Sequence, residues 1–328
     1  MFKKIYKIFL HLAFFKSPQL VWRIFCGYFR AVILRQNVLR SVELAVTYQC
    51  QARCHKCYAK NLSNSSKPVL SIPQIKTIIS EALELGIIHV NITGGEPTLR
   101  KDICDIIRAC SPKKIMVSMV TNALCLTRDL VFEMRKAGLN TIQISLDSAD
   151  AGTHDSLRGV SGCYEAAMRA AEWSQEAGIT VCFSTVLSTE CSSNKDEMYK
   201  LLRLAESKKI FLLICDSADV GGWEGQGEKM MTCEERDNAL RELLRHPWAR
   251  HHQIYNFRMR EGCPAGTEKI YVTAYGDVTP CDLIHESYGN VFTDGLKKPW
   301  EKMCREEKFA MCSPHCIRYL IKENKIER

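Results

Sequence analysis

Three cysteines are grouped within eight residues near the start of the chain, in the segment Cys50-Gln-Ala-Arg-Cys54-His-Lys-Cys57. Their thiolates can converge on one metal centre only if the loop wraps around it. Three cysteine ligands suit a four-iron cluster, with one iron left open to an external chelating ligand. The alternative is a zinc site with His55 as the fourth ligand. The segment therefore predicts a metal centre, and its neighbours must decide between the two.

A second group of cysteines follows near the C-terminus. Cys263 and Cys281 flank a strand-like run, Lys269–Ala274, so this stretch is predicted to be a β-hairpin. Cys312 and Cys316 follow with three residues between them. The whole chain of 328 residues has 17 cysteines. Clustered cysteines in a long chain more often bind metal than form disulfides, which points to a reducing, cytosolic compartment.

The elements that must position the first cysteines alternate between strand and helix. Gly86, Gly138 and Gly178 stand where helices are expected to end. Six strand–helix units argue for a parallel sheet curled into a partial (β/α)6 barrel of TIM type, with its chemistry on the loops after the strands. The predicted strands are Leu44–Thr47, Ile87–Ile92, Lys114–Val120, Thr141–Ser145, Thr180–Val186 and Ile210–Cys215, and the predicted helices include Ile72–Leu85, Arg128–Ala137, Cys163–Ala177 and Lys195–Ser207.

The cysteine segment and its surroundings resemble the radical S-adenosylmethionine (SAM) superfamily. C-x-x-x-C-x-x-C after the first strand, an aromatic residue (Tyr58) after the third cysteine, and Gly94-Gly95-Glu96-Pro97 after the second strand match the family pattern. The resemblance implies a [4Fe–4S] cluster on the three cysteines. It also implies that Tyr58 packs near the adenine and that the glycine loop holds the methionine amino group. This joint match favours the iron–sulfur cluster over zinc.

The resemblance extends to the next strands. Ser145-Leu146-Asp147 followed by His154-Asp155-Ser156-Leu157-Arg158 resembles a stretch in the branch of the family that carries extra clusters. By that resemblance Ser145 lies near the ribose or carboxylate of SAM and Arg158 pairs with the methionine carboxylate. Asp147 binds the ribose or orders the loop. The family's Thr-Asn-Gly is Thr121-Asn122-Ala123 here, and the loss of the glycine's backbone freedom suggests that the local turn could differ. The further cofactor contacts expected are Asn122, Ser184 and the glycine-rich stretch 220–227.

The C-terminal cysteines resemble the SPASM/twitch extension of radical SAM enzymes, which binds auxiliary iron–sulfur clusters. A full SPASM domain carries a C-x2-C-x5-C-x3-C block of cysteines. In this chain only the C-x3-C end of that block is evident, at Cys312 and Cys316. We therefore expect one auxiliary [4Fe–4S] cluster, and Cys304 could replace one of its ligands. A zinc knuckle on the same residues is the alternative. The expected ligands are Cys263, Cys281, Cys312 and Cys316.

The first forty residues hold eight Lys and Arg and no acidic residue. Because the chain has 45 Lys and Arg against 37 Asp and Glu, residues 41–328 are formally neutral. A nucleic-acid partner is therefore not expected. Phe2, Ile5, Tyr6, Phe9, Leu10 and Ala13 mark one face of a helix, and Ser17-Pro18 opens a second helix to about Leu34. A basic amphipathic segment is expected to lie on an anionic membrane surface; packing on the barrel is the alternative.

These features predict four parts: a basic helical segment (1–40), the barrel (41–223), a linker (224–260) and the auxiliary-cluster domain (261–328). The resemblance implies an enzyme that uses an external one-electron reductant of the flavodoxin or ferredoxin type. It splits SAM into methionine and a 5′-deoxyadenosyl radical, which takes a hydrogen atom from substrate. The expected substrate is a ribosomally made peptide or protein, although no separate leader-binding domain is evident before the barrel. A lipid, a lipid-linked sugar or another small molecule is the alternative, and a non-catalytic zinc or iron–sulfur scaffold is the competing class.

Overall fold

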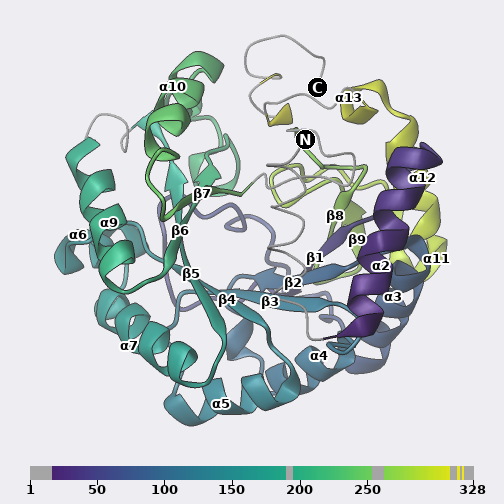
Figure 1. Ribbon diagram of the computed structural model, residues 1–328, viewed down its shortest axis with the longest axis horizontal. Helices are drawn as coiled ribbons and strands as arrows, with labels where there is room; N and C mark the ends of the chain where they lie inside the picture. Colours follow the sequence, from purple (N-terminus) through teal and green to yellow (C-terminus); the bar gives the residue numbers. More distant parts are fainter. Residues whose placement is uncertain (1–16, 190–194, 253–261, 311–315, 318–319, 321–328) are drawn as a thin grey trace.

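The fold is a curled sheet with helices on its outer face (Figure 1). The computed structural model describes residues 17–189, 195–252, 262–310, 316–317 and 320. The sheet has ten strands in the order β10-β9-β8-β1-β2-β3-β4-β5-β6-β7. The strands are β1 (Ser41–Thr47), β2 (His89–Gly94), β3 (Met116–Thr121), β4 (Thr141–Ser145), β5 (Thr180–Leu187), β6 (Phe211–Asp216), β7 (Ala249–His251), β8 (Lys269–Val272), β9 (Asp277–Thr279) and β10 (Gly289–Asn290).

Strands β1 to β7 run parallel to their neighbours, and β8 is also parallel to β1. This confirms the predicted partial barrel. Alternate residues of β1 point to opposite faces, as in any strand. Val42 and Leu44 belong to the core between the sheet and the helices. Ser41 and Glu43 therefore point to the inner side of the curled sheet.

The helices agree closely with the sequence periodicity, and Gly86 and Gly138 end α3 and α5 in the left-handed conformation with φ of 109° and 112°. The helices α4 and α6 fill further gaps between strands, where helices were expected but not given bounds. The helices of the barrel are α3 (Ile72–Leu85), α4 (Ile103–Ala109), α5 (Arg128–Ala137), α6 (Ala151–Arg158), α7 (Cys163–Glu176), α9 (Lys195–Ser207) and α10 (Cys233–Leu243), and those near the C-terminus are α11 (Val291–Asp294), α12 (Lys297–Arg305) and α13 (Glu307–Ala310).

Residues 224–260, expected as a linker with a helical stretch over Glu234–Leu244, contain α10 and also the short strand β7, which pairs with β6. Three residues are too few to give an alternating pattern that sequence inspection could find. The predicted hairpin at the C-terminal cysteines is present as β8 and β9, which pair antiparallel. Because β8 also pairs with β1, the hairpin continues the barrel sheet.

The helix predicted from Ser17-Pro18 is present as α2 (Pro18–Tyr28), continued by a π-helical turn over Phe29–Ile33. The Ser17 hydroxyl does not cap the helix and instead donates to the carbonyl of Lys113 at 2.7 Å. Figure 1 shows α2 on the outside of the barrel, near α3 and α12. The amphipathic pattern between Phe2 and Ala13 lies outside the described residues. Among the described residues, no helix combines the length and apolar character needed to cross a membrane.

Candidate active site

Cys50, Cys54 and Cys57 share the loop after β1 and line a cavity of about 1000 Å³. Within the described part of the chain, no group of three His, Cys, Asp or Glu ligand atoms within 4.8 Å of one another includes these cysteines or His55. Zn–S bonds of about 2.3 Å would bring the sulfurs around one zinc to within about 4 Å of each other. The sulfurs of Cys50, Cys54 and Cys57 are therefore spread more widely than sulfurs bound to one zinc ion. Their spacing fits a larger, four-iron cluster better.

The chemical surroundings of these sulfurs suit metal-bound thiolates. The Asn122 side-chain amide donates to Cys50 Sγ at 3.5 Å, and Arg158 Nη1 donates to Cys54 Sγ at 3.8 Å. Burial raises the pKa of Cys50 to about 11 and also raises the pKa of Cys57. These two cysteines are therefore protonated when no metal is bound, and cluster assembly must displace their protons.

The Gly94-Gly95 loop after β2 lies directly against the start of the cysteine loop. Gly94 has a φ of +136°, and a Cβ placed there would be 2.0 Å from the carbonyl oxygen of Thr47. A Cβ on Gly95 would be 2.4 Å from the carbonyl oxygen of Gln49. Only glycine allows this approach. The backbone N–H of Gly95 donates to the Thr47 carbonyl at 2.8 Å, so the two loops form one unit.

Glu96 fastens this loop to the turn after β3. Its buried carboxylate accepts hydrogen bonds from Thr98 N and Oγ1 at 3.1 and 2.5 Å, from Thr121 Oγ1 at 2.8 Å and from Asn122 N at 2.7 Å. Burial raises the pKa of Glu96, and these donors oppose that rise. Pro97 opens a short 3-10 turn that directs Thr98 back to the carboxylate. Glu96 and Pro97 thus position the loop, and direct contact with cofactor stays a prediction.

Ala123 occupies the position where the family pattern has glycine, and it keeps the glycine-like conformation, with a φ of 71°. A non-glycine residue in this region costs about 1–2 kcal/mol. Ala123→Gly should therefore raise the free energy of unfolding by about 0.5–1 kcal/mol, after the greater entropy of glycine in the unfolded chain is subtracted. Urea denaturation would measure the change. Ala239→Gly, in the middle of α10, should lower the free energy of unfolding by about 1 kcal/mol; a loss of stability in both variants would contradict the strain at Ala123.

Asp147 is the centre of a buried ion-pair network. Lys56 Nζ lies 2.5 Å from Oδ1, and Arg158 Nη2 lies 2.7 Å from Oδ2, while the Asp147 side chain is 1% exposed. Burial alone would raise the pKa of Asp147, but the charges of Arg158 and Lys56 outweigh it and hold the pKa below the usual range. Asp147 therefore orders the site by joining the cysteine loop to α6. Lys56 was not predicted, although its place between Cys54 and Cys57 was a signal.

His154 supports the same network from α6. The backbone N–H of Asp147 donates to His154 Nδ1 at 3.1 Å, so the neutral ring carries its proton on Nε2. Burial lowers the pKa of His154 to about 4. His154 Nε2, Arg158 Nε and Gln51 Oε1 are buried and have no partner among the described residues. None of these three residues lines the cavity, so the fit to a bound cluster and SAM rests instead on the residues that do: the three cysteines, Gly95 and Asp147.

The remaining predicted cofactor contacts, Ser145, Ser184 and Tyr58, do not line the cavity. Ser145 and Ser184 are paired in register on β4 and β5. The Tyr58 hydroxyl donates to the carbonyl of Gly94 at 3.2 Å, and its ring lies edge-on to Tyr271 at 6.4 Å. Contact of Tyr58 with adenine stays a prediction.

The glycine-rich stretch 220–227 packs on the cysteine loop. The backbone N–H of Gly222 donates to the Cys57 carbonyl at 2.8 Å. A Cβ on Gly222 would be 2.0 Å from the His55 carbonyl oxygen. Trp223 and Gln226 of the same stretch line the cavity. These residues therefore form one wall of the candidate SAM site.

Three of the four predicted auxiliary ligands lie together. Cys263 and Cys316 share a hydrogen bond that lowers the pKa of Cys263. The charge of Cys281 helps to raise the pKa of Cys316, and the charge of Cys263 helps to raise that of Cys281. Cys312 lies outside the described residues. Cys304 lies on α12, with its thiol directed at the carbonyl of Gly266 at 3.7 Å. The structure thus groups Cys263, Cys281 and Cys316, and the full ligand set stays a prediction.

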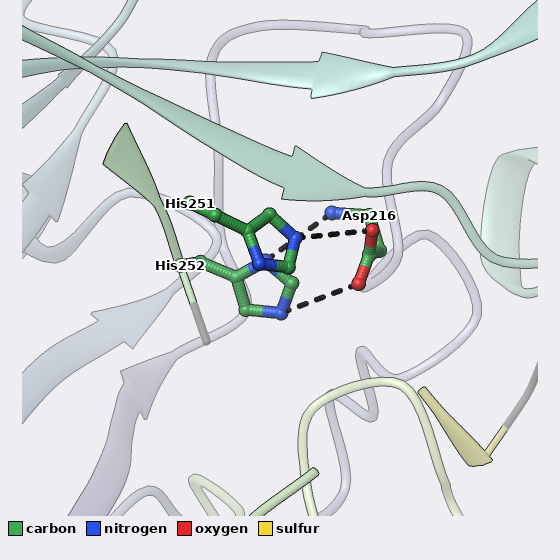
Figure 2. Close-up of side chains that lie close together, drawn as sticks. All are labelled: Asp216, His251 and His252. Carbon is green, nitrogen blue, oxygen red and sulfur yellow. Dashed lines mark hydrogen bonds and ion pairs between the residues drawn. The ribbon is translucent and has the colours of Figure 1, made fainter. Parts of the chain in front are cut away.

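A further polar cluster, not singled out from the sequence, lies where β6 and β7 end (Figure 2). His251 Nε2 lies 3.2 Å from Asp216 Oδ1, and His252 Nε2 lies 3.8 Å from Oδ2. These three residues have ligand atoms close enough for one metal ion. However, Arg236 donates to both carboxylate oxygens of Asp216, at 2.7 and 3.1 Å. The Arg236 guanidinium thus already supplies the positive charge that a metal ion would bring to Asp216. The cluster instead holds α10 against the sheet.

The first cysteine loop, the Gly94–Pro97 loop and the Asp147 network thus meet beside one cavity. A family model described as the radical SAM superfamily matches residues 44–205, and one described as an iron–sulfur cluster-binding domain (SPASM) matches residues 263–320. The chain belongs to the radical SAM superfamily. It is a radical SAM enzyme with a SPASM-type C-terminal domain, as the sequence predicted. Its family cofactors are SAM, a [4Fe–4S] cluster and auxiliary iron–sulfur clusters.

Relatives of this radical SAM enzyme include proteins named for peptide and for heme chemistry. It is 26% identical over 271 residues to PqqA peptide cyclase of Methylocella silvestris, covering 78% of this chain and 72% of that one. It is 25% identical over 300 residues to AdoMet-dependent heme synthase of Methanosarcina barkeri, covering 82% and 84%. The fold is similar to Streptococcus suis SuiB bound to precursor peptide SuiA, with a TM-score of 0.66, 18% identity and coverage of 84% and 66%. The chain thus spans just under two thirds of SuiB.

Proposed function

We propose that this radical SAM enzyme modifies a ribosomally made peptide or protein. The observation that carries the proposal is that one sheet holds both a SAM-type site and, at its end, a second cysteine group. An auxiliary cluster on that second group could accept an electron from the substrate radical. Relatives named PqqA peptide cyclase and a similar fold solved with a precursor peptide support a peptide as substrate. An external one-electron reductant of the flavodoxin or ferredoxin type would supply the electron that starts the reaction.

Cys50, Cys54 and Cys57 would hold the first cluster, and Cys263, Cys281, Cys312 and Cys316 the auxiliary one. When bound, the cluster and SAM supply a 5′-deoxyadenosyl radical that removes a hydrogen atom from substrate. The chain's part is to orient and enclose these groups. Glycines at 94, 95 and 222 let their loops pack directly on the backbone of residues 47–55, which leads into the cysteine loop, and Glu96 fixes the position of the Gly94–Gly95 loop. Asp147 holds the Arg158 guanidinium in place, and by the family resemblance the fork of that guanidinium would pair with the methionine carboxylate.

The test begins with protein purified without oxygen and reconstituted with iron and sulfide. About eight irons per chain are expected, four for each cluster, together with 5′-deoxyadenosine after addition of dithionite and SAM. The enzyme is then co-expressed with peptides from short reading frames beside its gene, and the peptides are analysed by mass spectrometry. A peptide changed in mass supports the proposal. If every peptide is unchanged and a tetrapyrrole is converted instead, the peptide assignment is wrong.

We further propose that α2 places the enzyme on an anionic membrane surface. The helix packs on the barrel through Leu20, Ile24 and Gly27, and Arg23 donates to the carbonyls of Leu83 and Ile87 at 2.5 and 3.0 Å. These contacts fix which face is outward. On that face Trp22, Phe25 and Phe29 stack in a row and are 65%, 59% and 46% exposed. Exposed aromatic side chains on a basic segment suit the interface of an anionic bilayer.

Replacing both Trp22 and Phe25 with serine should reduce binding to vesicles of phosphatidylcholine and phosphatidylglycerol at least about tenfold, because two aromatic anchors are lost. Co-sedimentation of the full chain measures the bound fraction. Binding of the parent should also weaken as salt is added, since the attraction of exposed charges is screened. Leu244→Ser is the matched control, because Leu244 is 42% exposed at the end of α10, which lies across the barrel from α2 (Figure 1). A parent protein that stays in the supernatant with anionic vesicles contradicts the proposal.

A further inference from the structure

Lys269 is a half-buried cation on the inner side of the barrel. It opens β8 and lies opposite Ser41 of β1 in the parallel register. Its side chain is 16% exposed, and its Nζ lies 3.2 Å from Glu43 Oε1 and 3.4 Å from Asp282 Oδ1. Neither the radical SAM motif nor the network around Asp147 uses these three residues. Withdrawing an ammonium and two carboxylates largely from water is costly, so this group is expected to have a role.

The position of Lys269 relative to the C-terminal cysteines indicates this role. Lys269 lies between Cys263 and Cys281 in the chain, and its partner Asp282 directly follows Cys281. Burial alone would lower the pKa of Lys269, but Glu43, Asp282 and the sulfurs of Cys281 and Cys263 raise it well above the ordinary value. Lys269 is also tied to both cysteine segments by contacts. Its Nζ lies 3.4 Å from Asp282, next to Cys281. Its backbone N–H donates to the carbonyl of Pro264, next to Cys263, at 2.8 Å. Glu43 extends the same group of charges to the neighbouring strand β1.

We propose that Lys269 is a positioning residue that sets the reduction potential of the auxiliary cluster through its fixed positive charge. A cluster that accepts one electron becomes more negative by one charge. A nearby cation stabilises the reduced form more than the oxidised form, because the Coulomb attraction grows with the charge that it meets. Lys269 thus makes the cluster a better electron acceptor. Glu43, which holds the ammonium from the side of the barrel, partly offsets this effect. The inference rests on the auxiliary cluster of the proposed function.

The experiment measures the midpoint potential of the auxiliary cluster by EPR during a redox titration. The parent is the full chain with Cys50, Cys54 and Cys57 replaced by alanine, so that only the auxiliary cluster contributes to the signal. The pH is kept well above the value of about 7 to which burial raises the pKa of Glu43. The variants are Lys269→Met, Lys269→Arg and Glu43→Gln, each compared at equal iron content.

In Lys269→Met the equilibrium constant for one-electron reduction should fall at least about tenfold, a shift of about 59 mV to lower potential. Lys269→Arg keeps the charge and should stay close to the parent. Glu43→Gln should shift the potential the other way, by a smaller amount. A merely structural defect would not shift the potential in opposite directions in these two variants, so the comparison identifies a charge effect. If Lys269→Met fails to bind its cluster, the shift of Glu43→Gln relative to the parent can still be measured.

Two outcomes would overturn the inference, and they differ from each other. If the parent binds a cluster but Lys269→Met and Glu43→Gln shift its potential in the same direction or not at all, the role of Lys269 is wrong and the proposed function stands. If the parent binds no iron at the C-terminal cysteines, the auxiliary cluster itself is absent. In that case the inference and the cofactor assignment of the proposed function both fail.

Discussion

Asp147→Asn is expected to destabilise the protein by about 3–5 kcal/mol, because removing one partner of a buried ion pair leaves an uncompensated charge. Here two cations would lose their partner, since Lys56 and Arg158 both pair with Asp147 and are only 11% and 12% exposed. The amide has nearly the same shape as the carboxylate, so the charge is the main change. Urea denaturation of the cluster-free chain would give the difference in unfolding free energy.

The pH dependence of this difference has a definite sign. Arg158 and Lys56 outweigh the effect of burial and hold the pKa of Asp147 below its usual range in the folded protein. The carboxylate therefore contributes stability above its unfolded pKa of about 4. That contribution is lost as the pH falls through the folded pKa. The advantage of the parent over Asp147→Asn should thus shrink as the pH is lowered below about 4.

The matched control is Glu176→Gln, which breaks the ion pair between Arg128 and Glu176 on the surface, where the side chains are 53% and 50% exposed. Exposed pairs contribute about 0–1 kcal/mol, so this variant should remain close to the parent. Equal stability losses in the two variants would show that the Asp147 network is solvated, and that it does not hold the cysteine loop on α6.

The strands, most helices and the two cysteine groups could be predicted from sequence because their signals are local. The helical repeat of apolar residues in Ile72–Leu85 can be seen within one short stretch of sequence. The same is true of the spacing of Cys50, Cys54 and Cys57. What connects distant stretches could not be predicted. Lys56 meets Asp147 across 91 positions, and Lys269 meets Glu43 across 226. An isolated charged residue normally indicates a solvated surface, and only the folded sheet brings these pairs together.

The turn at Ala123 marks another limit of the sequence. The replacement of glycine by alanine suggested that the local turn could differ, yet the backbone keeps its left-handed conformation at Ala123. The reason lies outside the turn. Glu96 accepts hydrogen bonds from Thr121 Oγ1 and Asn122 N at 2.8 and 2.7 Å, and the Thr121 hydroxyl accepts one from Ala123 N at 2.9 Å. These tertiary contacts override the local preference of alanine.

Gly94→Ala should reduce the rate of 5′-deoxyadenosine formation at least about 100-fold, because a displacement of about 1 Å in a positioning element can cost that much. The new Cβ would lie 2.0 Å from the Thr47 carbonyl oxygen, and neither backbone can yield without moving the cysteine loop. The hydrogen bonds from Gly95 N to Thr47 O at 2.8 Å and from Glu96 N to Gln49 O at 2.9 Å would be lost with it. The rate is measured with dithionite and SAM at equal iron content.

Gly162→Ala separates this contact from backbone strain. Gly162 also has a positive φ, of +79°, but a Cβ there would meet nothing within 4 Å. Its replacement should cost only the strain of the left-handed conformation, about 1–2 kcal/mol of stability, and leave the rate per folded molecule within about twofold. If Gly94→Ala behaves like Gly162→Ala in both stability and rate, the close approach of the two loops is not what positions SAM. The orientation of the cofactor would then depend on the Asp147 side of the cavity instead.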